Sequence, residues 1–172
     1  MRIELKKIKF FEAMSEETNA FVADVFINGT KVAYTKNEGH GGCTFYHLYD
    51  IKHRELLKEA EAFCLALPPV RYRDFEFPMN LEYKINELFE HWLKEKDIAK
   101  MLLKLQKSML NSLCLKTENG YTELSWKSGR RKLTIAELVS VPNGRETLRN
   151  AIAKAKAEGR EVLNTNIPQE LF

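Results

Sequence analysis

The chain has 172 residues, of which 44% are hydrophobic and 30% are charged, and its formal net charge is +3. A chain of this length and composition can build one globular core, and it excludes a long disordered tract. No run of about 20 apolar residues could cross a bilayer, and no apolar stretch near Met1 has the length of a signal peptide, so we expect a cytoplasmic protein without a membrane partner. Three cysteines do not make a disulfide framework, and we expect free thiols.

The N-terminal region predicts an antiparallel β-meander. Apolar and polar residues alternate along residues 2 to 11, and the alternation changes phase at Lys6-Lys7, which indicates a β-bulge. The pair Asn28-Gly29 is typical of a type I′ turn, and it joins predicted strands at residues 20 to 27 and 30 to 36.

Two helical regions follow the meander. Between Asp50, the expected N-cap, and the stop at Pro68-Pro69, apolar residues recur at helical spacing. The next segment, VRYRDFEFP, alternates aromatic and charged residues, which indicates an edge strand or an exposed binding segment. Residues 80 to 112 then resume the helical pattern, and the charged stretch KEKD favours a break near Lys96 over one long helix.

The C-terminal region predicts a second hairpin and two short helices. The hairpin turns at Asn119-Gly120, and TIAE at Thr134 is a capping box that begins a helix ended by Pro142. Asn143 repeats the capping spacing before a last helix closed at Gly159, and the tail EVLNTNIP predicts an edge strand. Together the elements predict a single α+β domain over residues 1 to 172, in which the meander packs against the central helices.

The stretch EGHGGCTFYH, residues 38 to 47, is the first candidate site. It places flexible backbone beside side chains that bind metals, and four readings stay open: a metal site, an anion cradle, a reactive thiol and a plain connecting loop. We favour a contact loop without metal or cofactor, because the spacing of the possible ligands matches no common zinc module and no Walker lysine follows. The contact residues would be Gly39, His40, Gly41, Gly42, Cys43, Tyr46 and His47, and the ligands of any metal would be His40, Cys43, His47 and His53.

The glycines of this stretch lead to a separate hypothesis about its backbone conformation. Glycine costs folding entropy relative to alanine wherever alanine could adopt the same backbone angles. We therefore expect the backbone here to take positive φ angles or to approach a partner closely.

A basic segment is the second candidate site. Residues 127 to 160 contain nine lysines and arginines and three glutamates, so this segment carries a net charge of +6 and the rest of the chain carries −3. Such a segment is typical of a solvated basic face or of a surface that contacts nucleic acid. The candidate phosphate contacts are Arg130, Arg131, Lys132, Arg145 and Arg149.

The stretch MSEETNAFVADVFINGTKVAYTKNEGHGGCTFYH and the closing LNTNIP resemble a family of small uncharacterised proteins of bacteriophages and other mobile elements of gut bacteria. No activity is attached to this family. The resemblance implies a non-enzymatic, anti-defence accessory protein in the host cytoplasm, which inhibits a host protein or sequesters a signalling nucleotide. The alternatives from other classes are a nucleic-acid-binding protein that uses residues 127 to 160, and a metal-dependent or thiol enzyme centred on His40, Cys43 and His47.

Overall fold

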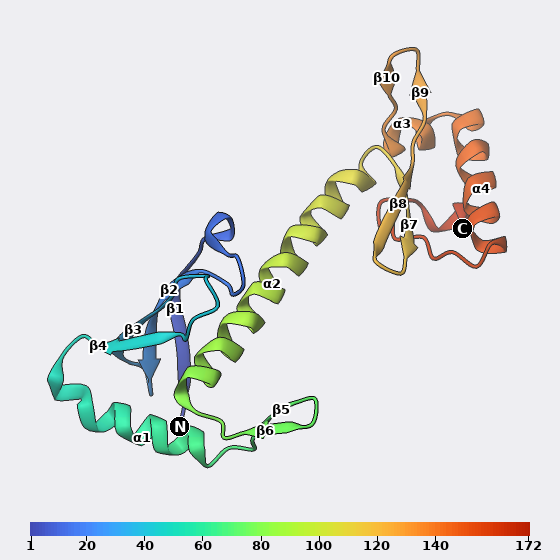
Figure 1. Ribbon diagram of the computed structural model, residues 1–172. Coiled ribbons are helices and arrows are strands. Elements are labelled where there is room, and N and C mark those ends of the chain that lie inside the picture. The colour runs from blue at the N-terminus through green and yellow to red at the C-terminus, as the bar shows by residue number, and fades with distance from the viewer. The chain divides into compact units, whose positions relative to one another are not determined.

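The computed structural model describes residues 1–172, with only the backbone described at Tyr72. The chain divides into two compact units, Met1–Glu95 (unit 1) and Lys96–Phe172 (unit 2). The buried side chains form two clusters, one in each unit, where the sequence pattern alone suggests one core. Antiparallel strands and helices occur in both units, so the predicted α+β class is confirmed (Figure 1).

Unit 1 contains a four-stranded antiparallel sheet in the order β1-β2-β3-β4. Its strands are β1 (Ile3–Phe10), β2 (Phe21–Ile27), β3 (Thr30–Asn37) and β4 (Phe45–Leu48). The predicted bulge is confirmed, since Lys7 has φ +52° and the register shifts beside it. Asn28 and Gly29 have φ +49° and +83°, as a type I′ turn requires. Strand β4 was not predicted, because its four residues follow the glycines directly and are too few to show a period.

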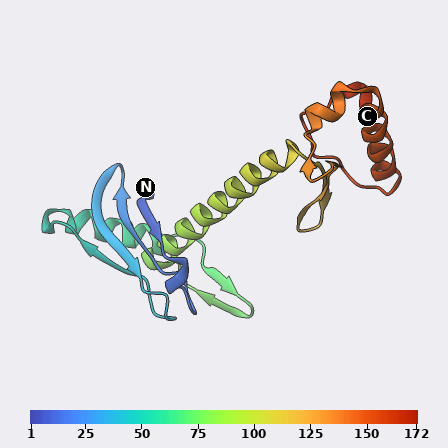
Figure 2. The ribbon, with the colours of Figure 1, turned by 90° about the horizontal axis from the view of Figure 1, so that it is seen from above.

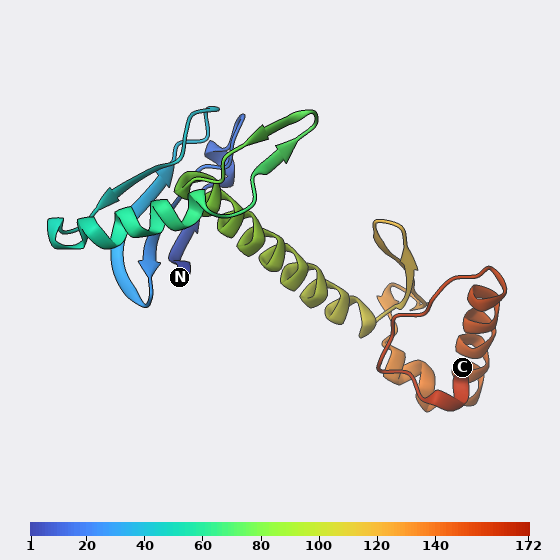
Figure 3. The same ribbon diagram turned by 90° about the horizontal axis from the view of Figure 1, so that it is seen from below.

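The inner face of this sheet forms the core of unit 1. Helix α1 (Arg54–Leu65) lies on one side of the strands, as Figures 2 and 3 show from opposite directions. Ala60 and Cys64 of this helix are buried against the sheet, and Phe89 of α2 stacks on Phe21 with ring centroids 4.0 Å apart. The outer face carries exposed aromatic side chains, so among the described residues of unit 1 no element covers it.

Helix α2 (Leu81–Met109) is continuous, so the predicted break near Lys96 is wrong. The stretch KEKD contains no proline or glycine, and its charged side chains stay in solvent while the helical hydrogen bonds continue. Two short 3-10 turns also belong to unit 1: η1 (Glu12–Met14) lies between β1 and β2, and η2 (Ile51–His53) lies between β4 and α1. Asp50 caps η2, because its side chain accepts a hydrogen bond from Lys52 N. The segment VRYRDFEFP forms a hairpin of β5 (Val70–Tyr72) and β6 (Phe75–Phe77).

In unit 2 the last part of α2 is followed by the predicted second hairpin, β7 (Leu113–Thr117) and β8 (Gly120–Leu124). The small hairpin β9 (Lys127–Ser128) and β10 (Arg131–Lys132) comes next. The capping box at Thr134 is present and begins α3 (Ile135–Ser140). Helix α4 (Pro142–Ala157) begins at the proline, not after Asn143, because proline suits the first helical position. The turn η3 (Gln169–Leu171) ends the chain.

Two local predictions in unit 2 need correction. Residues 118 and 119 form the turn of the second hairpin, so Asn119-Gly120 is not the central pair of a type I′ turn. The tail contributes one antiparallel bridge, between Val162 and Leu115, in place of a full edge strand. In the part of the chain that the structure describes, no helix combines the length and the apolar character needed to cross a membrane.

Candidate functional site

The glycine loop, residues 38 to 44, is held against the segment that precedes β2. The carbonyl oxygen of Gly39 accepts three backbone hydrogen bonds, from Glu16, Glu17 and Thr18, at 3.0, 3.0 and 3.2 Å. Gly39 is buried and has φ +91°, and a Cβ atom there would lie 2.2 Å from the carbonyl oxygen of Met14. Only glycine fits this position without displacing the backbone.

The buried side chain of Asn37 organises the rest of the loop. Its Oδ1 accepts hydrogen bonds from Gly39 N and Thr18 Oγ1, both at 2.9 Å, and its Nδ2 donates to Gly42 O and Thr44 Oγ1. Thr44 N in turn donates to the Glu82 carboxylate of α2 at 2.8 Å. The expected positive φ angles are present at Gly39 and Gly41, so these two glycines serve the fold of unit 1.

The loop is not arranged as an anion cradle. The N–H groups of Gly39, Gly41 and Thr44 already donate to side chains of the protein. Carboxylates surround the loop as well: Glu16 Oε2 lies 3.1 Å from His40 Nδ1, and Glu17 lies against Gly41. Negative charge and satisfied donors both disfavour a phosphate here.

The histidines and cysteine of the first candidate site do not converge. His40 and Cys43 are exposed in the loop, His47 is exposed on β4, and His53 ends η2. Among the described residues no group of three or more histidines, cysteines or carboxylates could hold a metal ion, and Cys43 has no hydrogen-bonded histidine. The other two cysteines are buried, and burial raises the pKa of Cys114 to about 11.

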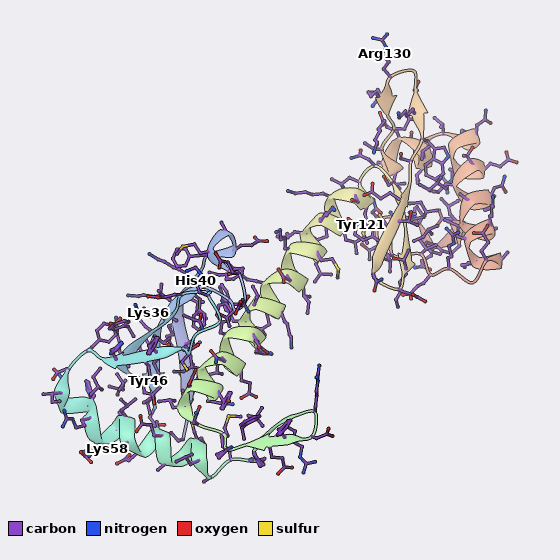
Figure 4. The ribbon with its side chains drawn as sticks, viewed as in Figure 1. Lys36, His40, Tyr46, Lys58, Tyr121 and Arg130 are labelled. Atoms are coloured by element: carbon purple, nitrogen blue, oxygen red, sulfur yellow. The ribbon has the colours of Figure 1, made fainter. Side chains whose placement is uncertain are left out.

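Tyr46 and His47 point to opposite faces of the sheet. Tyr46 is half-buried on the inner side, where its hydroxyl donates to Glu61 Oε1 of α1 at 2.8 Å (Figure 4). Burial is the main cause that raises the pKa of Tyr46, and the Glu61 carboxylate adds to it. Tyr46 therefore helps to position β4, while His47 is left on the outer side.

The outer side of the sheet gathers aromatic and basic side chains from all four strands. Alternation along the strands turns one residue in two to this side, and Tyr49 continues it just after β4. We call this surface the outer sheet face. It comprises Glu4, Lys6, Lys7, Lys9, Val22, Asp24, Phe26, Lys31, Tyr34, Lys36, Phe45, His47 and Tyr49.

Three rings of the outer sheet face form a continuous group. The ring centroid of Tyr34 lies 5.2 Å from that of His47 and 5.8 Å from that of Tyr49. Tyr34 is 37% exposed and Tyr49 is 49% exposed, although aromatic side chains of this size usually contribute to a core. The rings therefore present their area to solvent or to a partner.

A buried carboxylate fixes one of these rings. Asp24 is 7% exposed, and its Oδ1 accepts a hydrogen bond from the Tyr49 hydroxyl. Lys31 Nζ lies 2.9 Å from Asp24 Oδ2, as an ion pair and not as a directed hydrogen bond, and 4.0 Å from the centre of the Tyr49 ring. Burial acts to raise the pKa of Asp24, but the Tyr49 hydrogen bond and the Lys31 ammonium outweigh it, so the pKa lies below its ordinary value of 3.8.

This network leads to a prediction about acid stability. A lowered folded-state pKa means that ionised Asp24 stabilises the fold above pH 3.8 and that this contribution is lost as the pH falls through the folded value. We expect Asp24→Asn to lower the free energy of unfolding by about 1–3 kcal/mol at neutral pH, and the difference from the unmodified protein to shrink below about pH 4. Urea titrations at several pH values measure it. Asp74→Asn, at an exposed turn, is the control, and a pH-independent difference would contradict the assignment.

Two of the hollows on unit 1 differ in charge. One, of about 370 Å³, opens on the outer sheet face and is lined by Lys7, Lys9 and Lys31 with Tyr34 and Tyr49. The other, of about 250 Å³, lies beside the glycine loop and has no basic side chain in its lining; it is bounded by Glu17, Thr18, Asn19, Phe21, Asn37, Asn86, Phe89 and Glu90. Of these two, only the first has the basic lining that a phosphate-bearing ligand requires.

The basic residues of unit 2 are partly paired with carboxylates. Arg131 bonds Glu137 at 2.7 Å and Arg145 bonds Glu170 at 2.8 Å. Arg130 lies at the tip of the β9–β10 hairpin (Figure 4). Arg149 is exposed one turn beyond Arg145 on α4. The segment is thus a surface of mixed charge with Arg130 as its most prominent cation.

Of the residues on the outer sheet face, the sequence analysis identifies only His47 as a candidate contact residue. The available signal is the alternation in residues 33 to 36, which places Tyr34 and Lys36 opposite the buried residues of the strand, whereas Lys31 reaches the same face only because the register shifts at Val32. This pattern does not show that residues 45 to 49 share the same face, because β4 is too short to be recognised from the sequence.

Comparisons with protein-family models, curated proteins and solved structures find no match to this chain.

Proposed function

We propose that the protein acts by binding and without catalysis, and that its outer sheet face binds single-stranded nucleic acid. One observation carries the proposal: three exposed rings, in which Tyr34 contacts both His47 and Tyr49, lie among lysines on an uncovered β-sheet face. Unpaired bases stack on such rings, and lysines neutralise the adjacent phosphates.

The chemistry of the face distinguishes a single strand from related ligands. A duplex keeps its bases stacked inside the helix, so the rings of Tyr34, His47 and Tyr49 would contribute little to its binding. A free signalling nucleotide offers one or two bases, whereas the rings and lysines of the face extend across all four strands. A single strand can use both the rings and the charges along their whole extent.

The resemblance adds a context to this proposal, that of an accessory protein of a phage or mobile element in the host cytoplasm. Contact with a host protein is the second candidate, and the glycine loop favours it. The loop is held in one conformation by Asn37 and presents His40, Gly42 and Cys43 to solvent. A preformed loop of this kind loses little conformational entropy on binding.

The proposal is tested with fluorescein-labelled oligo(dT) and oligo(U) of about 20 nucleotides, a length that covers a typical single-strand site. We expect the fluorescence anisotropy to rise on titration with the protein, and the affinity to fall with salt by a log–log slope of about −0.7 for each phosphate contacted. The DNA and RNA oligonucleotides distinguish the two sources of single strand. A duplex of the same length should bind more weakly, and a mononucleotide should not compete at comparable concentration.

Lysine variants locate the surface. Lys9→Ala and Lys36→Ala remove charges of the outer sheet face, whereas Lys58→Ala removes an exposed lysine of α1 that pairs with Glu55 (Figure 4). We expect the first two to weaken binding and to reduce the salt slope, and Lys58→Ala to leave both unchanged. No binding to either single strand at low salt would overturn the proposal. So would a loss of binding caused only by Arg130→Ala with Arg131→Ala, which would assign the activity to the basic hairpin of unit 2.

A further inference from the structure

Helix α2 contains a segment that is exposed to solvent around the whole helix. All residues from 94 to 104 are exposed. They include four large apolar residues within six positions, with exposures of 55% at Ile98, 45% at Met101, 48% at Leu102 and 60% at Leu103. Isolated exposed apolar residues are ordinary, but a group of this density on one helix usually marks a contact surface.

Two of these residues, Ile98 and Leu102, fall on a stripe that continues toward the end of the helix. Ile98, Leu102, Leu105 and Met109 are spaced by four, three and four residues, which is the a/d spacing of a coiled coil. Met101 lies beside the stripe, and the stripe becomes buried at Met109. Leu103 lies well off the stripe, since each residue advances about 100° around the helix.

The charges of the segment indicate what can cover the stripe. Lys100, Lys104 and Lys107 fall at positions that point away from the partner in a two-stranded coiled coil. The positions that flank the seam are uncharged, namely Ala99, Met101, Gln106 and Ser108. An identical helix can therefore approach this face without like charges meeting across the seam, although the segment as a whole is basic.

We propose that two copies of this chain pair through the α2 stripe, with Ile98, Leu102 and Leu105 in the seam. The pairing is symmetric, because the same apolar face serves both partners. The inference is independent of nucleic-acid binding, since the stripe and the outer sheet face share no residue.

The test compares neighbouring leucines on one helix. Sedimentation velocity of the full chain, from about 1 to about 200 μM, should show a concentration-dependent monomer–dimer equilibrium, since dimerisation follows mass action. Leu102→Glu should raise the dimer dissociation constant at least about 10-fold, because it places two carboxylates in an apolar seam. Leu103→Glu introduces the same charge one residue away and should leave the constant unchanged. Far-ultraviolet circular dichroism checks that both variants retain their helices.

A cysteine variant tests the contact directly. The exposed Cys43 is first changed to serine, and the buried Cys64 and Cys114 remain. Leu102→Cys in this background should form a covalent dimer under mild oxidation, whereas Leu103→Cys should not. A protein that stays monomeric at the highest concentration would overturn the inference. A dimer weakened equally by both glutamate substitutions, or one unaffected by Leu102→Glu, would also overturn it and assign the pairing to another surface.

Discussion

Replacing Tyr34 and Tyr49 together with alanine should weaken oligo(dT) binding by about 100-fold, because each ring that stacks on a base contributes about 1–3 kcal/mol by alanine substitution. The two ring centroids lie 5.8 Å apart, the Tyr34 ring also contacts His47, and the Tyr49 hydroxyl donates a hydrogen bond to Asp24, so the two rings form a preformed platform. The measurement is the anisotropy titration at one fixed salt concentration. Each single substitution should show a part of the loss.

Two controls separate stacking from folding. Tyr83→Ala removes a tyrosine of α2 that is also 37% exposed but lies off the outer sheet face, and it should bind as the unmodified protein does. Tyr49→Phe keeps the ring and removes the hydroxyl that donates to Asp24, so it should keep most of the affinity. An equal loss in Tyr83→Ala, or full affinity in the double alanine variant, would show that these rings do not form the site.

Gly39→Ala should lower the free energy of unfolding by about 3 kcal/mol, since it combines a left-handed backbone with overpacking. The residue has φ +91°, and a Cβ atom would come within 2.2 Å of Met14 O and 3.0 Å of Ala20 Cβ. Because the nearest atom belongs to the backbone, a side-chain rotation cannot relieve the contact. Urea denaturation followed by circular dichroism measures the change.

Gly42→Ala is the matched comparison, because Gly42 is an exposed residue of the same loop, three positions after Gly39. Gly42 has no positive φ, and a Cβ atom there would meet no heavy atom within 4 Å. We expect its free energy of unfolding to stay within about 0.5 kcal/mol of the unmodified value, or to rise slightly as the unfolded chain loses freedom. If Gly39→Ala were as stable as Gly42→Ala, the packing of the loop described above would be incorrect.

Because we expect Gly42→Ala to leave the fold intact, it is also the variant that tests contact with a host protein.

Several elements could be predicted from the sequence because neighbouring residues decide them. Asn28-Gly29 adopts positive φ angles that few other pairs tolerate, Thr134 and Glu137 satisfy each other's backbone donors, and the phase change at Lys6-Lys7 requires a bulge. The α+β class follows from the order of such elements. These interactions extend over a few residues, so their signals are present in the sequence itself.

Tertiary contacts decided the parts that bear on function. Strand β4 exists because β3 offers it an edge, and its pairing places His47 opposite Tyr34, thirteen residues earlier in the chain. Asp24, Lys31 and Tyr49 meet across three segments, and the same is true of Asn37, Thr18 and Thr44 at the glycine loop. The sequence by itself thus determined the class of fold and the turn at Asn28-Gly29. The tertiary structure alone decided that Gly39 and Gly41 serve packing and that aromatic rings and lysines share one open face, because residues distant in sequence become neighbours only when the strands pair.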